Sequence, residues 1–267
     1  MLDALSFFDL TDFAHSRVFS GGEFVWDALK NLKSYMDGAI DAPLQDRLIT
    51  DGVPLERPLV IHEGEIVDGN ECRIVFGNVS KGGLVVERDG SQLQGASVLM
   101  AGCVLMGSRI ELGRGVLVES GALIKEPAII GDRTEVRQGA YLRGYCLTGS
   151  RCVLGHTTEI KHSIFLNDAK AGHFAYLGDS ILGTAANLGA GTKMANLRFL
   201  AGNVKIKTGR EILETGLRKL GAILGDHAQT GCNSVTNPGT LMGKKSILMP
   251  NTTAPSGYHP DQSVIRN

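Results

Sequence analysis

The sequence has few aromatic residues, almost no net charge and no long apolar run. Phe, Trp and Tyr make up 6% of the 267 residues, and the formal net charge is −1. A balanced charge gives no electrostatic reason to bind nucleic acid or a membrane surface. Because no run of about 18 apolar residues occurs, and no basic segment precedes an apolar run at the N-terminus, we expect a cytoplasmic protein without a transmembrane helix.

The sequence also lacks a cysteine or histidine pattern typical of metal or redox sites. The cysteines are Cys72, Cys103, Cys146, Cys152 and Cys232, and no two form a CxxC pair. We expect free thiols in a reducing compartment rather than a disulfide framework. Among the histidines, His156 and His162 are six residues apart, which is not a zinc-ligand spacing, so the sequence predicts no metal site.

What the sequence does contain is abundant glycine, 35 residues, and an apolar period of six. The series is Met106, Leu112, Val118, Ile124, Ile130, Val136, Leu142, Thr148, Leu154 and Ile160. Only Thr148 in it is polar. The period fits neither a helix, with a period of about 3.6, nor an ordinary strand, with a period of about 2. It indicates an all-β fold, a parallel β-helix of hexapeptides with glycine at tight corners.

Three hexapeptides make one coil, so residues 18 apart should stack in the interior. The expected ladders are Met106–Ile124–Leu142–Ile160, Leu112–Ile130–Thr148 and Val118–Val136–Leu154. After Leu166 the next positions in register are glycines, and the apolar series resumes at Leu182. The pattern therefore predicts one shift of register within or just after residues 167–179. The series vanishes after Met194 and returns in register at Leu224.

The rest of the chain predicts additions to this β-helix. Residues 1–57 have no repeat and should form a helical and irregular segment, with a helix where Trp26, Leu29, Leu32 and Met36 follow helical spacing. The β-helix should occupy residues 58–252, with imperfect coils over 58–95 and a projecting, hairpin-like loop over about 199–219. Residues 253–267 are polar and contain two prolines, which predicts a C-terminal tail that crosses a neighbour or is disordered.

Three segments carry a family resemblance: TEVRQGAYLRG (134–144), TEIKHSIF (158–165) and KAGHFAYLGDSILGTAANLGAGTKMANLRF (170–199). They resemble the C-terminal acetyltransferase domain of the bifunctional N-acetylglucosamine-1-phosphate uridyltransferase/glucosamine-1-phosphate acetyltransferase family. The match as a whole covers roughly residues 95–252. The run ANLRF resembles the archaeal-type sugar-1-phosphate nucleotidyltransferase branch. The resemblance implies a left-handed parallel β-helix that assembles as a homotrimer, with the active site between subunits.

The nucleotidyltransferase half of that family has no counterpart in the sequence. Residues 1–57 are too short for it and contain no Gly-rich, Arg-containing nucleotide loop. The resemblance therefore supports acetyl transfer and makes nucleotidyl transfer an unexpected activity.

The resemblance also assigns roles to residues. His173, within KAGHFAY, matches the family's catalytic histidine, a general base; taken alone, it reads more simply as a corner histidine satisfied by the backbone. The matched sugar and phosphate contacts are Arg137, Lys161, Tyr176, Asn187 and Asn196. The matched contacts to acetyl-CoA, the acetyl donor, are Ala190 and Cys232. Without the motifs, these side chains would be interpreted as solvated cations and structural corner residues.

Three positions depart from the family pattern at the donor site. Cys232 stands where the bifunctional enzymes carry a serine, and a thiol is a weaker hydrogen-bond donor. Pro250 lies at a nearby coenzyme contact, and Gly202 replaces a lysine of the archaeal-type relatives; Lys205 is near it but does not align.

The resemblance thus implies an acetyl-CoA-dependent N-acetyltransferase that acts on an amino-sugar 1-phosphate, glucosamine-1-phosphate first, in UDP-N-acetylglucosamine or related nucleotide-sugar biosynthesis. The altered donor positions leave an alternative open. This is a non-catalytic trimer that binds a phosphosugar or nucleotide sugar or serves as a scaffold, or the partner of a separate nucleotidyltransferase. Neither nucleic acid nor a membrane is an expected partner.

Overall fold

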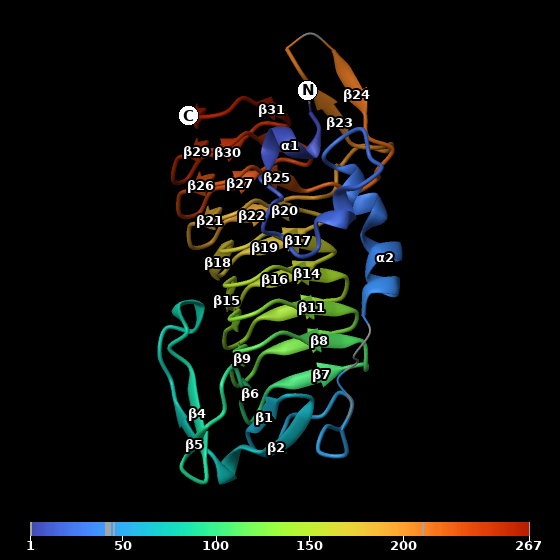
Figure 1. Cartoon of the computed structure of the whole chain (residues 1–267). Helices are drawn as coiled ribbons and strands as arrows, with labels where there is room; N and C mark the ends of the chain where they lie inside the picture. The colour runs from blue at the N-terminus through green and yellow to red at the C-terminus, as the bar shows by residue number, and fades with distance from the viewer. Residues whose placement is uncertain (1, 41–43, 45, 210, 267) are drawn as a thin grey trace.

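The chain forms the predicted left-handed parallel β-helix, in which three sheets wind around one apolar core (Figure 1). The computed structural model describes residues 2–40, 44, 46–209 and 211–266. Residues 41–43 and 45 of the predicted N-terminal segment, and residue 210 of the predicted projecting loop, lie outside this description. Each coil gives one short strand to each sheet, and the sheets run the length of the stack.

The three sheets are called sheet 1, sheet 2 and sheet 3, in the order in which a coil visits them. Sheet 1 contains β6 (Ser97–Leu99), β9 (Leu117–Val118), β12 (Glu135–Val136), β15 (Val153–His156), β18 (Lys170–His173), β21 (Asn187–Leu188), β26 (Gln229–Thr230), β29 (Ile247–Leu248) and β32 (Val264–Ile265). Sheet 2 contains β7 (Val104–Met106), β10 (Leu123–Lys125), β13 (Tyr141–Arg143), β16 (Glu159–Lys161), β19 (Tyr176–Gly178), β22 (Lys193–Met194), β27 (Val235–Thr236) and β30 (Thr253–Ala254). Sheet 3 contains β8 (Ile110–Leu112), β11 (Ala128–Ile130), β14 (Cys146–Thr148), β17 (Ser163–Phe165), β20 (Ile181–Leu182), β25 (Ala222–Leu224), β28 (Thr240–Met242) and β31 (Gly257–His259).

The predicted interior ladders are confirmed from Leu112 to Ile160. Ile124 pairs with Leu142 across β10 and β13, and Val118 pairs with Val136 across β9 and β12. These side chains are fully buried. Leu182 pairs with Leu224, so the register does return after the long interruption. Each buried apolar side chain contributes about 1.5–3 kcal/mol.

The predicted position of Met106 is wrong. Leu105, not Met106, pairs with Ile124 and is 2% exposed, whereas Met106 pairs with Lys125 and is half-buried. Two neighbouring apolar residues fit the period almost equally well. The coil that leads from Leu105 to Ile124 is one residue longer than the regular 18. The sequence pattern does not reveal this extra residue.

The structure contains two shifts of register: one lies within or just after residues 167–179, as predicted, and the other lies earlier and was not predicted. Phe165, not Leu166, continues the ladder of Thr148, and Ile160 pairs with Leu177. The steps from Ile160 to Phe165 and from Leu177 to Leu182 are therefore five residues long. Each short step crosses the corner after sheet 2, where His162 and Asp179 adopt positive φ. The run SIFL is apolar at three neighbouring positions, so the period alone could not choose among them.

The region 58–95 does not form imperfect coils, as predicted, but antiparallel strands. β1 (Leu59–His62) pairs antiparallel with β2 (Glu65–Asp68) and with β6. After the short helix η2 (Gly69–Glu71), β3 (Arg73–Val75), β4 (Val85–Arg88) and β5 (Ser91–Gln92) form a separate antiparallel sheet with η3 (Val79–Lys81) in its loop. The β3–β4 hairpin stands beside sheet 1 (Figure 1). The chain reverses at these turns instead of continuing around a coil.

The C-terminal segment is also not a tail. β30, β31 and β32 pair in parallel with β27, β28 and β29, and they complete the last coil. Short polar strands suffice there because the backbone hydrogen bonds, rather than large apolar side chains, fix the end of the stack. The projecting hairpin before it consists of β23 (Lys205–Lys207) and β24 (Ile212–Glu214), paired antiparallel (Figure 1).

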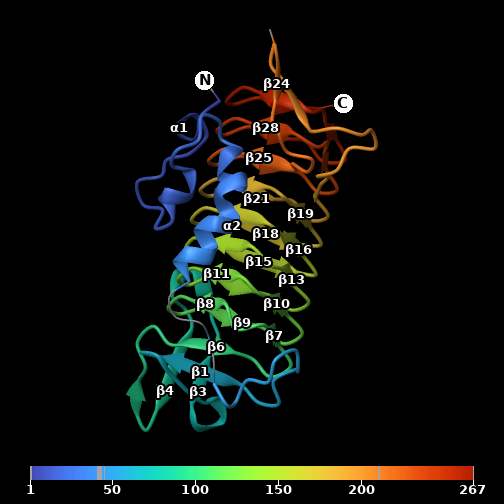
Figure 2. The same ribbon diagram turned by 90° about the vertical axis from the view of Figure 1, so that its right-hand side faces the viewer.

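The N-terminal segment covers the outer surface of sheet 3. It contains α1 (Ala4–Phe7), η1 (Ser16–Phe19) and α2 (Asp27–Ala39), and α2 runs along the side of the stack where a helix was predicted (Figure 2). Its aromatic and aliphatic side chains pack on an outward ladder of one apolar residue per coil: Ile129, Leu147, Ile164, Ile181, Ile223 and Leu241. The segment therefore closes one face of the β-helix, and sheets 1 and 2 are left to carry function.

Candidate active site

Three of the predicted residues lie on the corner between sheets 1 and 2, called here the first corner. His156 at the end of β15 pairs with His173 at the end of β18. On the next coils, Gly191 N–H donates to the His173 carbonyl (3.0 Å) and Asn233 N–H donates to the Ala190 carbonyl (2.8 Å). His173, Ala190 and Cys232 are therefore stacked on successive coils. The structure brings the predicted base and the two predicted coenzyme contacts together.

The His173 ring is exposed and has no hydrogen-bond partner among the described residues. Its neighbour Phe174 packs edge-to-face against His156 on the previous coil, with ring centroids 5.3 Å apart. His156 Nδ1 lies 3.0 Å from the Gln138 carbonyl. Since a carbonyl only accepts, Nδ1 carries hydrogen there. The two imidazoles thus differ: His156 is hydrogen-bonded to the backbone, whereas the His173 ring nitrogens have no partner among the described residues.

A floor of glycines runs beside this corner on the outer surface of sheet 1. A Cβ on Gly155 would collide with the Gly172 carbonyl, so only glycine fits there. Arg137 extends over this floor: its Nη1 lies 4.0 Å from the place a Gly172 Cβ would occupy. Arg137 Nη2 also donates to Glu135 Oε2 (3.0 Å). A guanidinium therefore lies over Gly172, the residue that precedes His173, where it can contact a phosphate.

Three other predicted residues, Lys161, Tyr176 and Asn196, gather at the corner between sheets 2 and 3, called here the second corner. The Tyr176 hydroxyl donates to Asn196 Oδ1 (3.5 Å), and Lys161 Nζ lies 3.8 Å from Asp179 Oδ2. Gly178 leaves the space that the Tyr176 and Asn196 side chains fill. Lys161 and Asn196 therefore share the Asp179 carboxylate, and Tyr176 joins this group through Asn196.

Asp179 organises this second corner, and sequence reasoning missed it. Asn196 Nδ2 donates to Asp179 Oδ2 (2.5 Å), and His162 Nδ1 lies 2.9 Å from Asp179 Oδ1. Burial alone would raise the pKa of Asp179, but the hydrogen bonds from His162 and Asn196 and the charge of Lys161 hold that pKa below its ordinary value. The residue stands inside the YLGD motif, yet nothing in its spacing shows which side chains it touches.

Tyr176 and His162 are two further partly buried polar side chains at the second corner. Burial is the main reason that the pKa of the Tyr176 phenol is raised, so this hydroxyl remains a donor at neutral pH. His162 Nε2 is buried without a hydrogen-bond partner among the described residues, while its Nδ1 faces Asp179.

Asn187 lies apart from both corners. It is on β21, on the outer surface of sheet 1, between Lys170 and Gln229 of the neighbouring strands. The predicted site residues thus form two groups within one chain, separated by the width of sheet 2. Arg137, His173, Asn187, Ala190 and Cys232 belong to sheet 1 and the first corner, and Lys161, Tyr176 and Asn196 belong to the second corner.

The positions that depart from the family pattern are also located. Cys232 is exposed, and its carbonyl accepts from Asn251 N–H (3.0 Å), which places Pro250 on the next coil of the first corner. Lys205 is ion-paired with Glu214 on the projecting hairpin and does not join either corner. Gly202 lies exposed in the loop before that hairpin.

No group of three or more His, Cys, Asp or Glu side chains could hold a metal ion in the part of the chain that the structure describes. In the same part, no helix combines the length and apolarity needed to cross a membrane.

The chain is similar to known proteins over part of its length. The family described as GMPPB C-terminal domain matches residues 124–217, which contain both corner groups except Cys232. A bifunctional sugar-1-phosphate nucleotidylyltransferase/acetyltransferase of Sulfurisphaera tokodaii is 36% identical over 151 residues, 50% of this chain and 38% of that protein. A bifunctional protein GlmU of Methanocaldococcus jannaschii is 38% identical over 104 residues, 39% of this chain and 25% of that protein.

The solved structures that match are more distant. A UDP-N-acetylglucosamine acyltransferase of Francisella novicida has a TM-score of 0.45 at 14% identity, over 59% of this chain and 56% of that one. The chain spans only about a quarter to two fifths of the two curated relatives described above. Over about half of its own length, this chain is similar to a bifunctional sugar-1-phosphate nucleotidylyltransferase/acetyltransferase, in agreement with the resemblance of its motifs.

Proposed function

We propose that this protein is an acetyl-CoA-dependent N-acetyltransferase whose acceptor is an amino sugar phosphorylated at C1, with glucosamine 1-phosphate as the first candidate. The acetyltransferase named in the relatives supports a sugar-directed transferase. The observation that carries the proposal is the first corner. There His173, an exposed imidazole with no hydrogen-bond partner among the described residues, directly follows the glycine floor that the Arg137 guanidinium reaches.

In the proposed reaction, the amine nitrogen attacks the thioester carbonyl carbon and an N–C bond forms. His173 accepts the proton that the nitrogen loses, which is typically worth about 10²–10⁴-fold in rate. The tetrahedral intermediate then re-forms its carbonyl and breaks the C–S bond, and the imidazolium protonates the departing thiolate of coenzyme A. The Ala190 N–H has no acceptor among the described residues, so it is free to donate to the oxyanion.

We infer that a second copy of the chain completes the site. His173, the proposed base, lies on the first corner, whereas Lys161, Tyr176 and Asn196 lie across sheet 2 on the second corner. A cyclic homotrimer that sets the second corner of one copy against the first corner of the next would join the two groups. Arg137 and Lys161 would then meet the same phosphate from two sides.

The test is release of the free thiol of coenzyme A by purified protein, with amino-sugar 1-phosphates as acceptors. We expect His173→Ala to lower kcat by about 10²-fold or more. His227→Ala is the matched control, because His227 is also an exposed corner histidine but follows sheet 3 instead of sheet 1. Equal turnover by wild type and His173→Ala would refute the base assignment.

A second candidate function is a non-catalytic trimer that binds a phosphosugar or nucleotide sugar. The observation that favours it is the pair Cys232 and Pro250 on the coenzyme side of the first corner, since a thiol donates weakly and proline has no N–H. A thermal shift with a nucleotide sugar, together with no shift and no thiol release with acetyl-CoA, would support this second function instead.

A further inference from the structure

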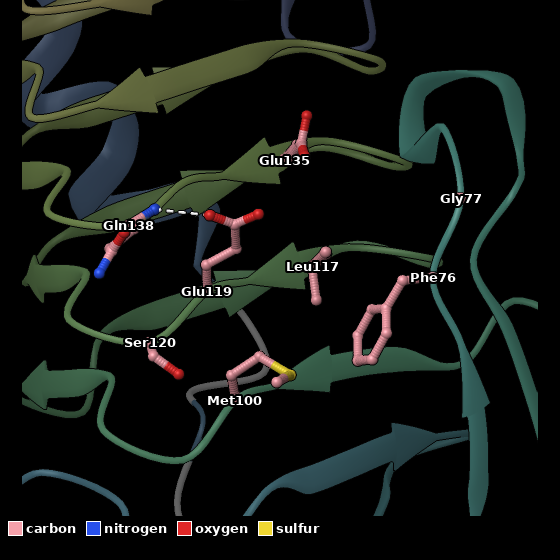
Figure 3. Close-up of a pocket in the computed structure, with 8 residues that line it drawn as sticks. All are labelled: Phe76, Gly77, Met100, Leu117, Glu119, Ser120, Glu135 and Gln138. Carbon is pink, nitrogen blue, oxygen red and sulfur yellow. Dashed lines mark hydrogen bonds between the residues drawn. The ribbon is translucent and has the colours of Figure 1, made fainter.

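A pocket of about 450 Å³ lies on the outer surface of sheet 1, two coils before His173 (Figure 3). Its lining residues are Phe76, Gly77, Met100, Leu117, Glu119, Ser120, Glu135 and Gln138. Gln138 belongs to the first corner, because its carbonyl contacts His156 on the next coil. The pocket therefore opens onto the same corner as the proposed base, and the proposed acetyl transfer makes no use of it.

One wall of the pocket is apolar and anchored. The Phe76 ring, 52% exposed, lies opposite Met100 and Leu117 (Figure 3). The loop that carries it is fixed by Val79, which is buried in a cluster with Leu117. A Cβ on Gly77 would lie 2.6 Å from the Gly83 carbonyl, so the loop is narrow as well as anchored. A flat ring of a ligand can stack on Phe76 without the loop having to order first.

The rim of the pocket consists of hydrogen-bonding groups with spare capacity. Glu119 Oε2 accepts from Gln138 N–H (2.8 Å), and no partner among the described residues binds its other oxygen. The Ser120 hydroxyl and the Gln138 side-chain amide have no partner there either. A carboxylate with a free oxygen is a strong acceptor for vicinal hydroxyls, the role an acidic residue has at a ribose. Glu135, the second carboxylate, is already paired with Arg137.

The charge of the surface changes sign from this pocket toward His173. Arg137 lies one coil beyond Glu119, and its guanidinium reaches on toward Gly172. Lys170 is exposed on β18, the strand that also carries Gly172, and it pairs with Val153 of the preceding strand. Neighbouring coils are about 4.8 Å apart. A ligand that follows this surface would meet an aromatic wall, then a hydroxyl acceptor, then cations, and finally the imidazole, all within a few coils.

We propose that the pocket binds the nucleoside of a nucleotide-linked amino sugar. The base stacks on Phe76, a ribose hydroxyl donates to Glu119, the diphosphate contacts Arg137, and the sugar amine reaches His173. This inference rests on the proposed acetyl transfer and specifies its acceptor: the phosphate on C1 carries a nucleoside. A cationic ligand fits less well, because Glu135 is already ion-paired with Arg137 and the positive charge of Arg137 lies at the exit of the pocket.

The test compares UDP-glucosamine with glucosamine 1-phosphate as acceptors in the thiol-release assay. Calorimetry with UDP, GDP, ADP and dTDP measures nucleoside binding separately. We expect the wild type to have a lower KM for the nucleotide-linked acceptor. Phe76→Ala should raise that KM about 10- to 100-fold, the loss expected for one base–aromatic stack, and leave the KM for glucosamine 1-phosphate unchanged. Val75→Ala is the control, because Val75 is 40% exposed on the same hairpin and does not line the pocket.

The possible results separate this inference from the proposed function. Equal KM values for both acceptors, with no effect of Phe76→Ala, would overturn the nucleoside pocket and leave acetyl transfer standing. If no acceptor gives thiol release, the proposed function fails, and calorimetry alone then decides whether the pocket binds a nucleoside. Binding of a nucleoside diphosphate that Phe76→Ala weakens and Val75→Ala does not would support the pocket. No binding, or binding of choline instead, would refute it.

Discussion

Asp179 links the fold to the proposed substrate groups, and Asp179→Asn tests this link. The substitution keeps the size of the side chain and removes its charge. The carboxylate accepts from Asn196, contacts His162 Nδ1 and lies 3.8 Å from Lys161 Nζ, and Asp179 is only 6% exposed. Hydrogen bonds to charged groups contribute about 1.5–3 kcal/mol each, and an asparagine keeps part of them. We therefore expect a loss of about 2–3 kcal/mol in the free energy of unfolding.

A loss of that size should lower Tm by about 4–12 °C in a protein of this length. Because the second corner positions Lys161 and Asn196, we also expect KM for a phosphorylated amino sugar to rise about tenfold with a smaller change in kcat. The control is Asp168→Asn. Asp168 forms a two-point contact with Arg151 at 2.9 and 2.7 Å, but both side chains are more than one third exposed. That variant should lose about 1 kcal/mol or less.

The pH dependence gives a second check on Asp179. The native pKa is lowered below the ordinary value of 3.8, so the unfolded state takes up a proton at higher pH than the folded state does. The stabilisation by the carboxylate is therefore complete above the unfolded pKa and is lost as pH falls through the lowered native pKa. The Tm difference between wild type and Asp179→Asn should shrink over that range. If the two proteins have the same Tm and KM at pH 7, the reasoning is refuted.

Two further predictions concern the fold. Leu105→Asp should unfold or severely destabilise the protein, whereas Met106→Asp should lower the free energy of unfolding only slightly, because only Leu105 points into the core. Urea unfolding of both variants measures the difference. If Met106→Asp is the more destabilised variant, the register with Met106 in the core is correct instead. Trp26→Ala should cost about 3–5 kcal/mol because the indole is fully buried in the apolar cluster that joins the N-terminal segment to the outer surface of sheet 3. The exposed Leu5→Ala serves as its control in the same melts, and a Trp26 variant as stable as that control would contradict the covering role of the N-terminal segment.

The repeat predicted more of the core than of the surface. Inward positions such as Ile124, Val136 and Leu224 follow directly from the period, since each must be apolar to pack on its neighbours. The register at Leu105 and at Phe165 did not follow, because adjacent apolar residues satisfy the period equally well. The antiparallel strands of 58–95 were mistaken for coils for a related reason: a short apolar strand has the same pattern whichever way the next strand runs.

The candidate residues came from motifs rather than from the period, and the motifs say nothing about distance. They could not show that His173 and Tyr176, three residues apart, serve two separate groups of side chains. They also passed over Asp179 and Phe76. Asp179 has a role through contacts from the preceding coil and from Asn196, and Phe76 matters only because its hairpin folds back beside sheet 1.

By itself, the sequence determined that this chain is a β-helix, which residues line its core, and which family its motifs resemble. A period of six leaves no other way to bury one apolar residue in every six. Only the tertiary structure decided which outward side chains meet. Those contacts depend on coil length and corner geometry, where one residue more or fewer moves a side chain to another position. They also depend on segments distant in sequence, such as the N-terminal helix on sheet 3 and the hairpin on sheet 1, which the repeat does not encode.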